Sequence, residues 1–527
     1  MLDKQRQFLV IGLAILGICF FLLSFFPLSY NNLDINFDFF LSRQQIIQKT
    51  NDFLKKIDIP PDDYFIIKAK TSFDYKAIAF LVKKVQREKI ASIIEDSPLY
   101  YWSVVYQVKS FFRQPDNLPS LIRLRVEPRR GRIIGFEAFY EKNIRKQKSC
   151  KSDISYFEIK HISNVFLNYA EFDISKFVLT RIAQIDASTF LVWEKDLFDF
   201  LDIHISYKVI MKIKDSRVSK LDYFLEVPFS TDKKEEIFNV SIYNFNNALF
   251  IILSLFVFVF CIKIKTVEWK RSAPFVILLI ITSFGSLFLK RTESSIFLAI
   301  ELGLYFLGLF LEMAWIIMVF TCAYHLGKNF GVEPYPIRIG YSITLSYIFT
   351  FVGISLMLFW SSFLNIFFKS FPGVSLIFSL LPSIKWYAIF APLAALSAAV
   401  LEEVFFRFFL FSFLKKYLKN IFLIIVISSL IWSVVHLTLL EYSELYPFYL
   451  KSLIIFPVGV LFGIIFAKFG LASVITTHYL YDNFIIGMFL FKFNQFREIH
   501  INLWILIISF LFPLVIAFLK KEKKFVI

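Results

Sequence analysis

Three clusters of polar residues interrupt the apolar last third of the chain. The first is LEEVFFR, residues 401–407, within an apolar run from about 391 to 414. A charged side chain at the centre of a membrane helix costs about 2.5–3.5 kcal/mol on insertion scales. Glu403 and Arg407 are four residues apart, so they share a helix face and can neutralise each other. Glu402 points about 100° away from Glu403 and is left as the carboxylate available for chemistry.

The other two clusters contain histidine. WSVVH places Trp432 one helical turn before His436. HYLYDN places His478 four residues before Asp482, with Asn483 next. A single buried histidine often serves only packing, and a buried Glu–Arg pair can serve only helix register. Three such clusters in neighbouring apolar segments argue against a purely structural role, because each carries the same membrane cost.

Amide hydrolysis is the chemistry that these residue types suit. It needs a base for water, stabilisation of the oxyanion and a proton for the leaving nitrogen. A glutamate in an intramembrane cavity can act as base and then as acid, while histidines hold the water and donate to the oxyanion. The sequence lacks GxSxG and HExxH motifs. Glu402, His436 and His478 would also make a His₂Glu zinc set, so both metal-activated and Glu-activated water stay open.

Membrane helices must position these clusters. The chain has 527 residues, of which 57% are hydrophobic and 69 are Phe. The apolar residues gather in blocks close to the roughly 20 residues that cross a bilayer. The first block follows Lys4 and Arg6 and is interpreted as an uncleaved anchor. With it we expect about ten spans, near residues 8–26, 247–264, 272–289, 295–324, 341–368, 386–414, 421–440, 450–467, 471–491 and 501–519.

The predicted fold is a polytopic α-helical membrane protein with an α+β domain inserted after the first span. Strand-like runs and amphipathic helical stretches fill the polar region, and its two halves suggest weakly related α+β units. The expected parts are the anchor (1–30), the polar α+β domain (31–246), accessory transmembrane helices (247–380), the helices that carry the three clusters (381–519) and a basic tail (520–527).

Charge sets the expected orientation. The formal net charge is +16, and much of it flanks apolar blocks, which the positive-inside rule explains better than nucleic-acid binding. We expect both termini in the cytoplasm, the α+β domain outside it, and the chain in the inner or cytoplasmic membrane. The lipid bilayer is then a partner, and nucleic acid is not. The sequence does not fix the oligomeric state.

The three clusters together resemble one family. The pattern EExxxR, then F/WxxxH, then HxxxN/D, each in a membrane helix, is that of the CAAX-protease and bacteriocin-processing (CPBP, or Abi) intramembrane peptidases. The resemblance covers about residues 385 to 491. It implies that Glu402 is the water-activating base with His436 beside it, and that His478 and the residue at 482 form the oxyanion site. Glu403, Arg407, Trp432 and Asn483 then take supporting positions.

One position departs from the family pattern. Many members carry Asn where this chain has Asp482, and Asn483 follows it. An ionised Asp cannot donate a hydrogen bond to an oxyanion. Asp482 is therefore protonated, or it orients His478, or Asn483 turns inward, or a metal is used.

The sequence predicts an intramembrane endopeptidase that cuts a peptide or a membrane-protein segment near the cytoplasmic half of the bilayer. Residues 381–519 are its expected CPBP-type peptidase core. Glu402, His436 and His478 should converge around one polar cavity, because each is costly alone in lipid. The alternative is a catalytically inactive CPBP-like scaffold, or a membrane transporter or sensor that relays protons through the same residues.

Overall fold

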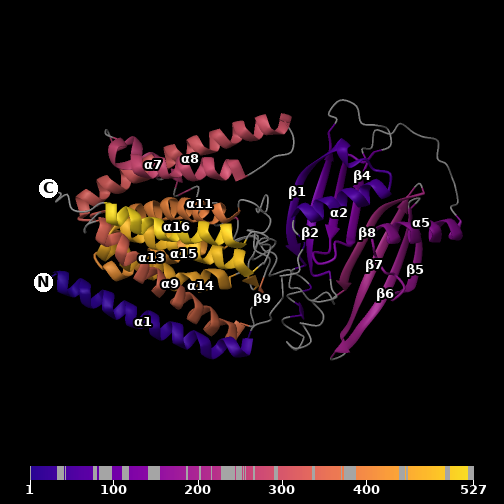
Figure 1. Cartoon of the computed structure of the whole chain (residues 1–527), viewed down its shortest axis with the longest axis horizontal. Helices are drawn as coiled ribbons and strands as arrows, with labels where there is room; N and C mark the ends of the chain where they lie inside the picture. The colour runs from indigo at the N-terminus through magenta and orange to yellow at the C-terminus, as the bar shows by residue number, and fades with distance from the viewer. Residues whose placement is uncertain are drawn as a thin grey trace.

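A helical bundle and a β-sheet domain make up the structure, and both chain termini lie at the end of the bundle away from the sheet (Figure 1). This computed structural model describes residues 2–31, 41–74, 98–109, 118–140, 155–226, 257–264, 267–334, 339–368, 387–437, 445–492 and 499–519, with short internal gaps and a few isolated positions between the ranges. The predicted basic tail at 520–527 and part of the apolar block at 247–264 lie outside the described residues.

The sheet has eight antiparallel strands in the order β1-β2-β3-β4-β8-β7-β6-β5. Two halves with the same element order build it, and they join where β4 pairs with β8, with Gly135 opposite Asp222. The first half consists of α2 (Arg43–Lys56), β1 (Tyr64–Phe73), β2 (Tyr100–Val108), β3 (Leu121–Val126) and β4 (Ile133–Phe139). The second half consists of α5 (Tyr156–Tyr169), β5 (Val178–Ile185), β6 (Ser188–Phe200), β7 (Ile203–Lys214) and β8 (Arg217–Glu226).

Apolar alternation along the strands gives this sheet a buried face. In β3, Ile122 and Leu124 are fully buried and Arg123 between them is exposed. This is the period of two that a half-buried strand requires. Phe53 of α2 and Phe166 of α5 contact each other edge to face, with ring centroids 5.5 Å apart, and both contact Phe136 of β4. The two helices therefore cover one face and share a core across the joint between the halves.

The bundle helices lie at the apolar blocks that the sequence marks. They are α1 (Leu2–Asn31), α7 (Trp269–Leu289), α8 (Ser295–Phe330), α9 (Ile339–Phe368), α11 (Tyr387–Glu402), α12 (Leu410–Tyr417), α13 (Ile421–Val435), α14 (Leu450–Phe469), α15 (Leu471–Lys492) and α16 (Ile499–Leu519). A π-helical segment, η2 (Glu403–Phe409), joins α11 to α12. Its wider turn is a feature that the ordinary helical period does not predict.

The membrane-spanning character has clear support, whereas the expected number of spans is not confirmed. In the described part of the chain, three helices are long and apolar enough to cross a membrane, namely Phe306–Phe330, Ile339–Leu364 and Leu450–Phe469. Three more apolar helices are shorter, at Phe8–Leu23, Ile421–Val435 and Leu503–Phe518.

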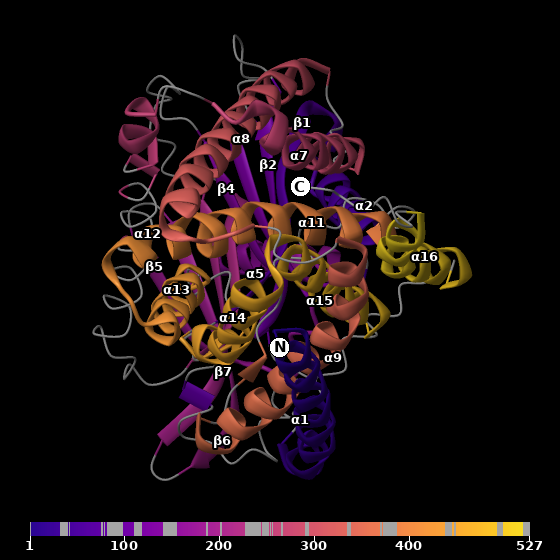
Figure 2. The ribbon, with the colours of Figure 1, turned by 90° about the vertical axis from the view of Figure 1, so that its left-hand side faces the viewer.

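Small residues let the helices around α11 and α15 approach closely. Ala391, Ala395 and Ala399 of α11 are fully buried at helical spacing, and α11 packs against α15 and α7. In Figure 2, α11 runs between α7 and α8 on one side and α13, α14 and α15 on the other. The Ser346 and Thr350 hydroxyls of α9 donate to backbone carbonyls of α15, at 3.0 and 3.3 Å. These bonds fix α15 where it carries its polar residues.

The buried and exposed strands of the sheet domain should respond very differently to truncation. Leu124 is fully buried in β3, so Leu124→Ala should cost about 2–5 kcal/mol of unfolding free energy through lost burial and a cavity. Ile182 of the edge strand β5 is 45% exposed, and Ile182→Ala should stay within about 0.5 kcal/mol. Denaturant unfolding of the full chain in detergent, followed by circular dichroism, measures both. Equal effects would contradict the described packing.

Candidate active site

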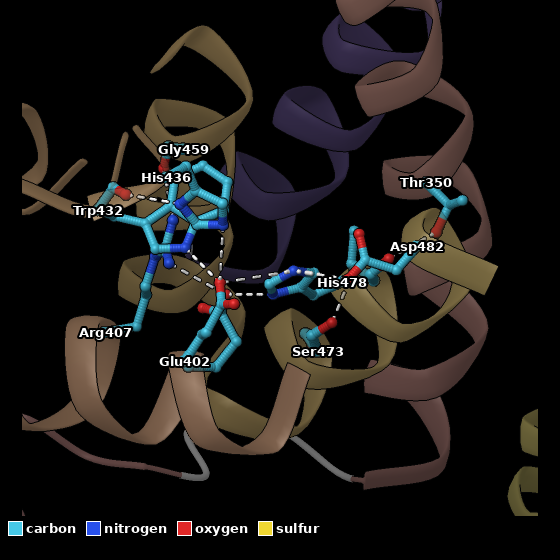
Figure 3. Close-up of polar contacts among 11 residues, drawn as sticks. Thr350, Glu402, Arg407, Trp432, His436, Gly459, Ser473, His478 and Asp482 are labelled. Atoms are coloured by element: carbon cyan, nitrogen blue, oxygen red, sulfur yellow. Dashed lines mark hydrogen bonds and ion pairs between the residues drawn. The ribbon is translucent and has the colours of Figure 1, made fainter. Parts of the chain in front are cut away.

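Three helices bring the predicted catalytic side chains to one point (Figure 3). Glu402 ends α11, His436 caps the C-terminus of α13, and His478 lies in α15. The Glu402 Oε2 atom is 3.6 Å from Nε2 of His436 and 4.0 Å from Nε2 of His478. The predicted convergence of these three side chains is thus confirmed.

Trp432 aligns Glu402 and His436 with each other. Its indole Nε1 donates to Glu402 Oε2 at 2.6 Å, and its carbonyl oxygen lies 2.8 Å from Nδ1 of His436. A carbonyl only accepts, so Nδ1 of His436 carries a proton, and Nε2 is the ring nitrogen that faces Glu402. The 3.6 Å distance from that Nε2 to Glu402 Oε2 is longer than a hydrogen bond, and one water beside the pair can contact both atoms.

Glu403 holds two partners at once. Its Oε1 accepts from Arg407 Nη1 at 3.1 Å and lies 2.7 Å from Nδ1 of His478. Glu403 and Arg407 are fully buried, as the predicted neutralising pair requires. The contact with His478 is one that sequence reasoning missed, because helix periodicity relates residues within one helix and says nothing about α15.

Arg407 is enclosed by aromatic rings. Its guanidinium carbon lies 4.5 Å from the Trp432 ring centroid and 5.6 Å from that of Phe462, and Nη2 donates to the Gly459 carbonyl at 3.4 Å. Such cation–π contacts offset part of the hydration free energy that the buried guanidinium loses on leaving water. Arg407 therefore links η2 to α13 and α14 around the site.

Asp482 and Asn483 face different partners. Asp482 Oδ2 lies 3.2 Å from Nε2 of His478. Asn483 donates from Nδ2 to the Ser509 hydroxyl of α16 at 3.0 Å, so it does not turn into the cluster. Of the alternatives open at position 482, the geometry favours an Asp that contacts His478. Asn483 instead fastens α15 to α16.

The donor set does not fit zinc. In the part of the chain that the structure describes, no three His, Cys, Asp or Glu side chains are placed to hold a metal ion together. Both ring nitrogens of His478 face carboxylate oxygens, Nδ1 toward Glu403 and Nε2 toward Asp482. A zinc ligand must offer a free lone pair. His478 as placed offers no such lone pair, so the zinc set of Glu402, His436 and His478 is not formed in this arrangement.

Comparison with known proteins covers the same region. Residues 384–484 match the family model of the type II CAAX prenyl endopeptidase Rce1-like proteins. These residues form a CPBP-family domain. The resemblance seen in the three motifs is confirmed, and the CPBP-family domain contains every residue of the cluster.

Two further similarities are more limited. The sporulation-killing factor biosynthesis protein SkfC of Bacillus subtilis (strain 168) is 26% identical over 106 residues, which cover 20% of this chain and 21% of that protein. The chain thus matches about a fifth of that curated relative. A solved structure, the Bacillus megaterium YpeB C-terminal domain, aligns with 35% of this chain and 63% of its own at 14% identity, with a TM-score of 0.19.

Gly459 is the tightest packing point beside the cluster, so it gives a sharp test of the geometry. A Cβ at this position would lie 2.7 Å from Cε3 of Trp432, whereas one at Gly353 would meet nothing nearer than 3.5 Å. Gly459→Ala should therefore cost about 1–3 kcal/mol through overpacking. Gly353→Ala should be neutral or stabilising, since Ala is favoured in a helix by roughly 0.5–1 kcal/mol. Thermal midpoints in detergent compare the two, and a tolerated Gly459→Ala would contradict the described Trp432 position.

Proposed function

We propose that this protein is an intramembrane endopeptidase that hydrolyses a peptide bond with water activated by Glu402 and His436. The observation that carries the proposal is the meeting of Glu402 with two histidines inside the CPBP-family domain. The substrate is a peptide or a membrane-protein segment, and the sequence contains nothing that points to a prenylated one. We propose the inner or cytoplasmic membrane as its location, with both termini in the cytoplasm and the sheet domain on the other side.

The first step uses the pair of Glu402 and His436. A water beside this pair contacts both groups, and its oxygen attacks the scissile carbonyl carbon. Glu402 takes the proton as the C–O bond forms. Trp432 restricts the carboxylate through its 2.6 Å hydrogen bond, so that the base is oriented before substrate arrives.

His478 is the proposed donor to the oxyanion. Both of its ring nitrogens face carboxylates, Glu403 at Nδ1 and Asp482 at Nε2. Ionised carboxylates only accept hydrogen bonds, so two such partners need a hydrogen on each ring nitrogen of His478. The three groups together then carry one proton more than a neutral imidazole and two ionised carboxylates would. The Nε2–H that Asp482 accepts can also be shared with the negative oxygen of the tetrahedral intermediate. Asp482 keeps the imidazole protonated and oriented.

Collapse of the intermediate completes the reaction. Glu402 returns its proton to the leaving nitrogen as the C–N bond breaks, so one carboxyl serves as base and then as acid. Glu403 and Arg407 stay buried throughout and hold His478 in place. The alternative of a silent scaffold or proton-relaying transporter is not favoured, because the matched family model is that of an endopeptidase.

Glu402→Gln tests the activity directly. Removal of the base should lower peptide-bond cleavage by about 10²- to 10⁴-fold, because the amide keeps the shape but cannot take a proton. An unbiased comparison of membrane-peptide fragments from cells with the native chain and with Glu402→Gln measures the loss. Glu333→Gln, at an exposed position before α9, is the matched control and should give the native fragment set. Identical fragments from native and Glu402→Gln cells would rule out the proposed hydrolysis.

Substitutions at position 482 test whether the reaction needs only a polar side chain that orients His478 or needs the carboxylate itself. Asp482→Asn should keep substantial activity, because the amide still contacts His478 and restores the more usual family residue. Asp482→Ala should lose about 100- to 1000-fold, as expected when support for one oxyanion donor is removed. Initial cleavage rates of purified variants give the ratio. An Asp482→Asn variant as inactive as Glu402→Gln would show that the carboxylate itself is needed.

A further inference from the structure

In each of the three helices that build the polar cluster, one member of the cluster is buried and a neighbouring member is partly exposed. In α11 and η2, Glu402 is 25% exposed and Glu403, the next residue, is fully buried. In α13, Trp432 is 3% exposed and His436, one turn later, is 25% exposed.

The third helix repeats the pattern. In α15, His478 is 3% exposed and Asp482, one turn later, is 26% exposed. Each helix thus carries one buried and one partly open member of the cluster.

The open members all lie toward the same end of the bundle. The helices α12 and α14 end at basic residues, and Lys419 precedes α13, so these termini mark one basic end. The α11 helix runs toward the basic end, whereas α13 and α15 start there and run away from it. Glu402 comes before its buried neighbour, and His436 and Asp482 come after theirs. Each open group is therefore the member farther from the basic end.

Buried side chains close the route from the cluster to the basic end. Arg407, Phe408 and Phe462 are fully buried on that side, and Ser429 of α13 is also fully buried two turns before His436. His436 lies about 24 Å along the helix from Asn420, at 1.5 Å per residue, so it ends α13 at the far end.

The sheet domain stands at that far end. Leu437, which directly follows His436, is buried in the same apolar cluster as the core of the sheet domain, and Val434 and Tyr449 pack against that cluster. Figure 1 shows the sheet domain at the end of the bundle opposite to both termini. A polypeptide that reaches His436 from this end passes the sheet domain first.

We propose that the polar cluster is open toward the sheet domain, so that the enzyme takes a polypeptide segment from the sheet-domain side of the membrane. With the orientation that the basic residues predict, this is the extracytoplasmic side, and cleavage then lies farther from the cytoplasm than the sequence alone suggests. The substrate class rests on the proposed peptidase function, whereas the direction of opening rests on the exposure pattern. The sheet domain acts as the first surface that selects the segment.

Sided cysteine labelling tests the opening without any need for activity. The four native cysteines are replaced by Ser, and single cysteines are introduced at His436 and Asp482. Vesicles of one orientation are treated with a membrane-impermeant maleimide from either side. Lys176→Cys on the exposed surface of the sheet domain and Lys416→Cys at the exposed basic end report the two sides, and the buried Ser429→Cys reports background.

The expected result is that His436→Cys and Asp482→Cys are labelled from the same side as Lys176→Cys, at least tenfold faster than Ser429→Cys. Labelling from the Lys416→Cys side overturns the proposal. Absence of labelling in both site variants, with Lys176→Cys reactive, overturns it as well. Two site variants are used because either substitution alone can disturb folding.

Cleavage-site mapping separates this inference from the proposed function. The fragments that depend on Glu402 should end in the substrate segment on the sheet-domain side of the bilayer. Ends that map to the opposite side refute the direction of entry and leave the peptidase function intact. If no fragment depends on Glu402, the peptidase proposal fails, while the labelling result still decides on which side the polar cluster is open.

Discussion

The buried carboxylate of Glu403 is the interaction on which the site depends. It lies between the Arg407 guanidinium on its own helical segment and the His478 imidazole of α15. With every member of this set buried, loss of one partner would leave an uncompensated charge, which costs about 3–5 kcal/mol in comparable buried pairs. The same contact that offsets this charge also fixes the ring of His478 against Asp482. Stability of the bundle and orientation of the proposed oxyanion donor therefore rest on one carboxyl group.

Close packing of α13 against α14 at two glycines also holds the site together. Gly459 admits the Trp432 ring, and that ring covers Arg407 on one face and donates to Glu402 at its edge. Gly463, one turn later, admits Ile425 in the same way, with a Cβ gap of only 2.8 Å. The α13 and α14 helices can thus approach until the aromatic ring bridges the structural ion pair and the proposed base. A larger residue at Gly459 would displace the Trp432 ring, and the contacts of that ring with Arg407 and Glu402 would be lost together.

The sheet domain contributes a second rigid body with its own core. Its two four-stranded halves are joined by the pairing of β4 with β8 and by contacts between α2 and α5, and Arg125 and Asp222 form an ion pair across the joint. Burial lowers the pKa of Arg125, and the Tyr101 hydroxyl and the Asp74 carboxylate oppose that shift. Contact with Leu437 places this body beside the end of α13.

The sequence by itself determined the helical blocks, the family of the C-terminal core and the ion pair of Glu403 with Arg407, because each follows from spacing along one helix and from the cost of charge in lipid. It also identified Glu402, His436 and His478 as residues that must meet. Only the tertiary structure decided that Glu403 contacts His478, that Asn483 faces α16, and that Asp482 contacts His478. These features depend on how α13, α15 and α16 are placed against η2. Helix periodicity carries no information about such contacts, because they join residues that are distant in the chain.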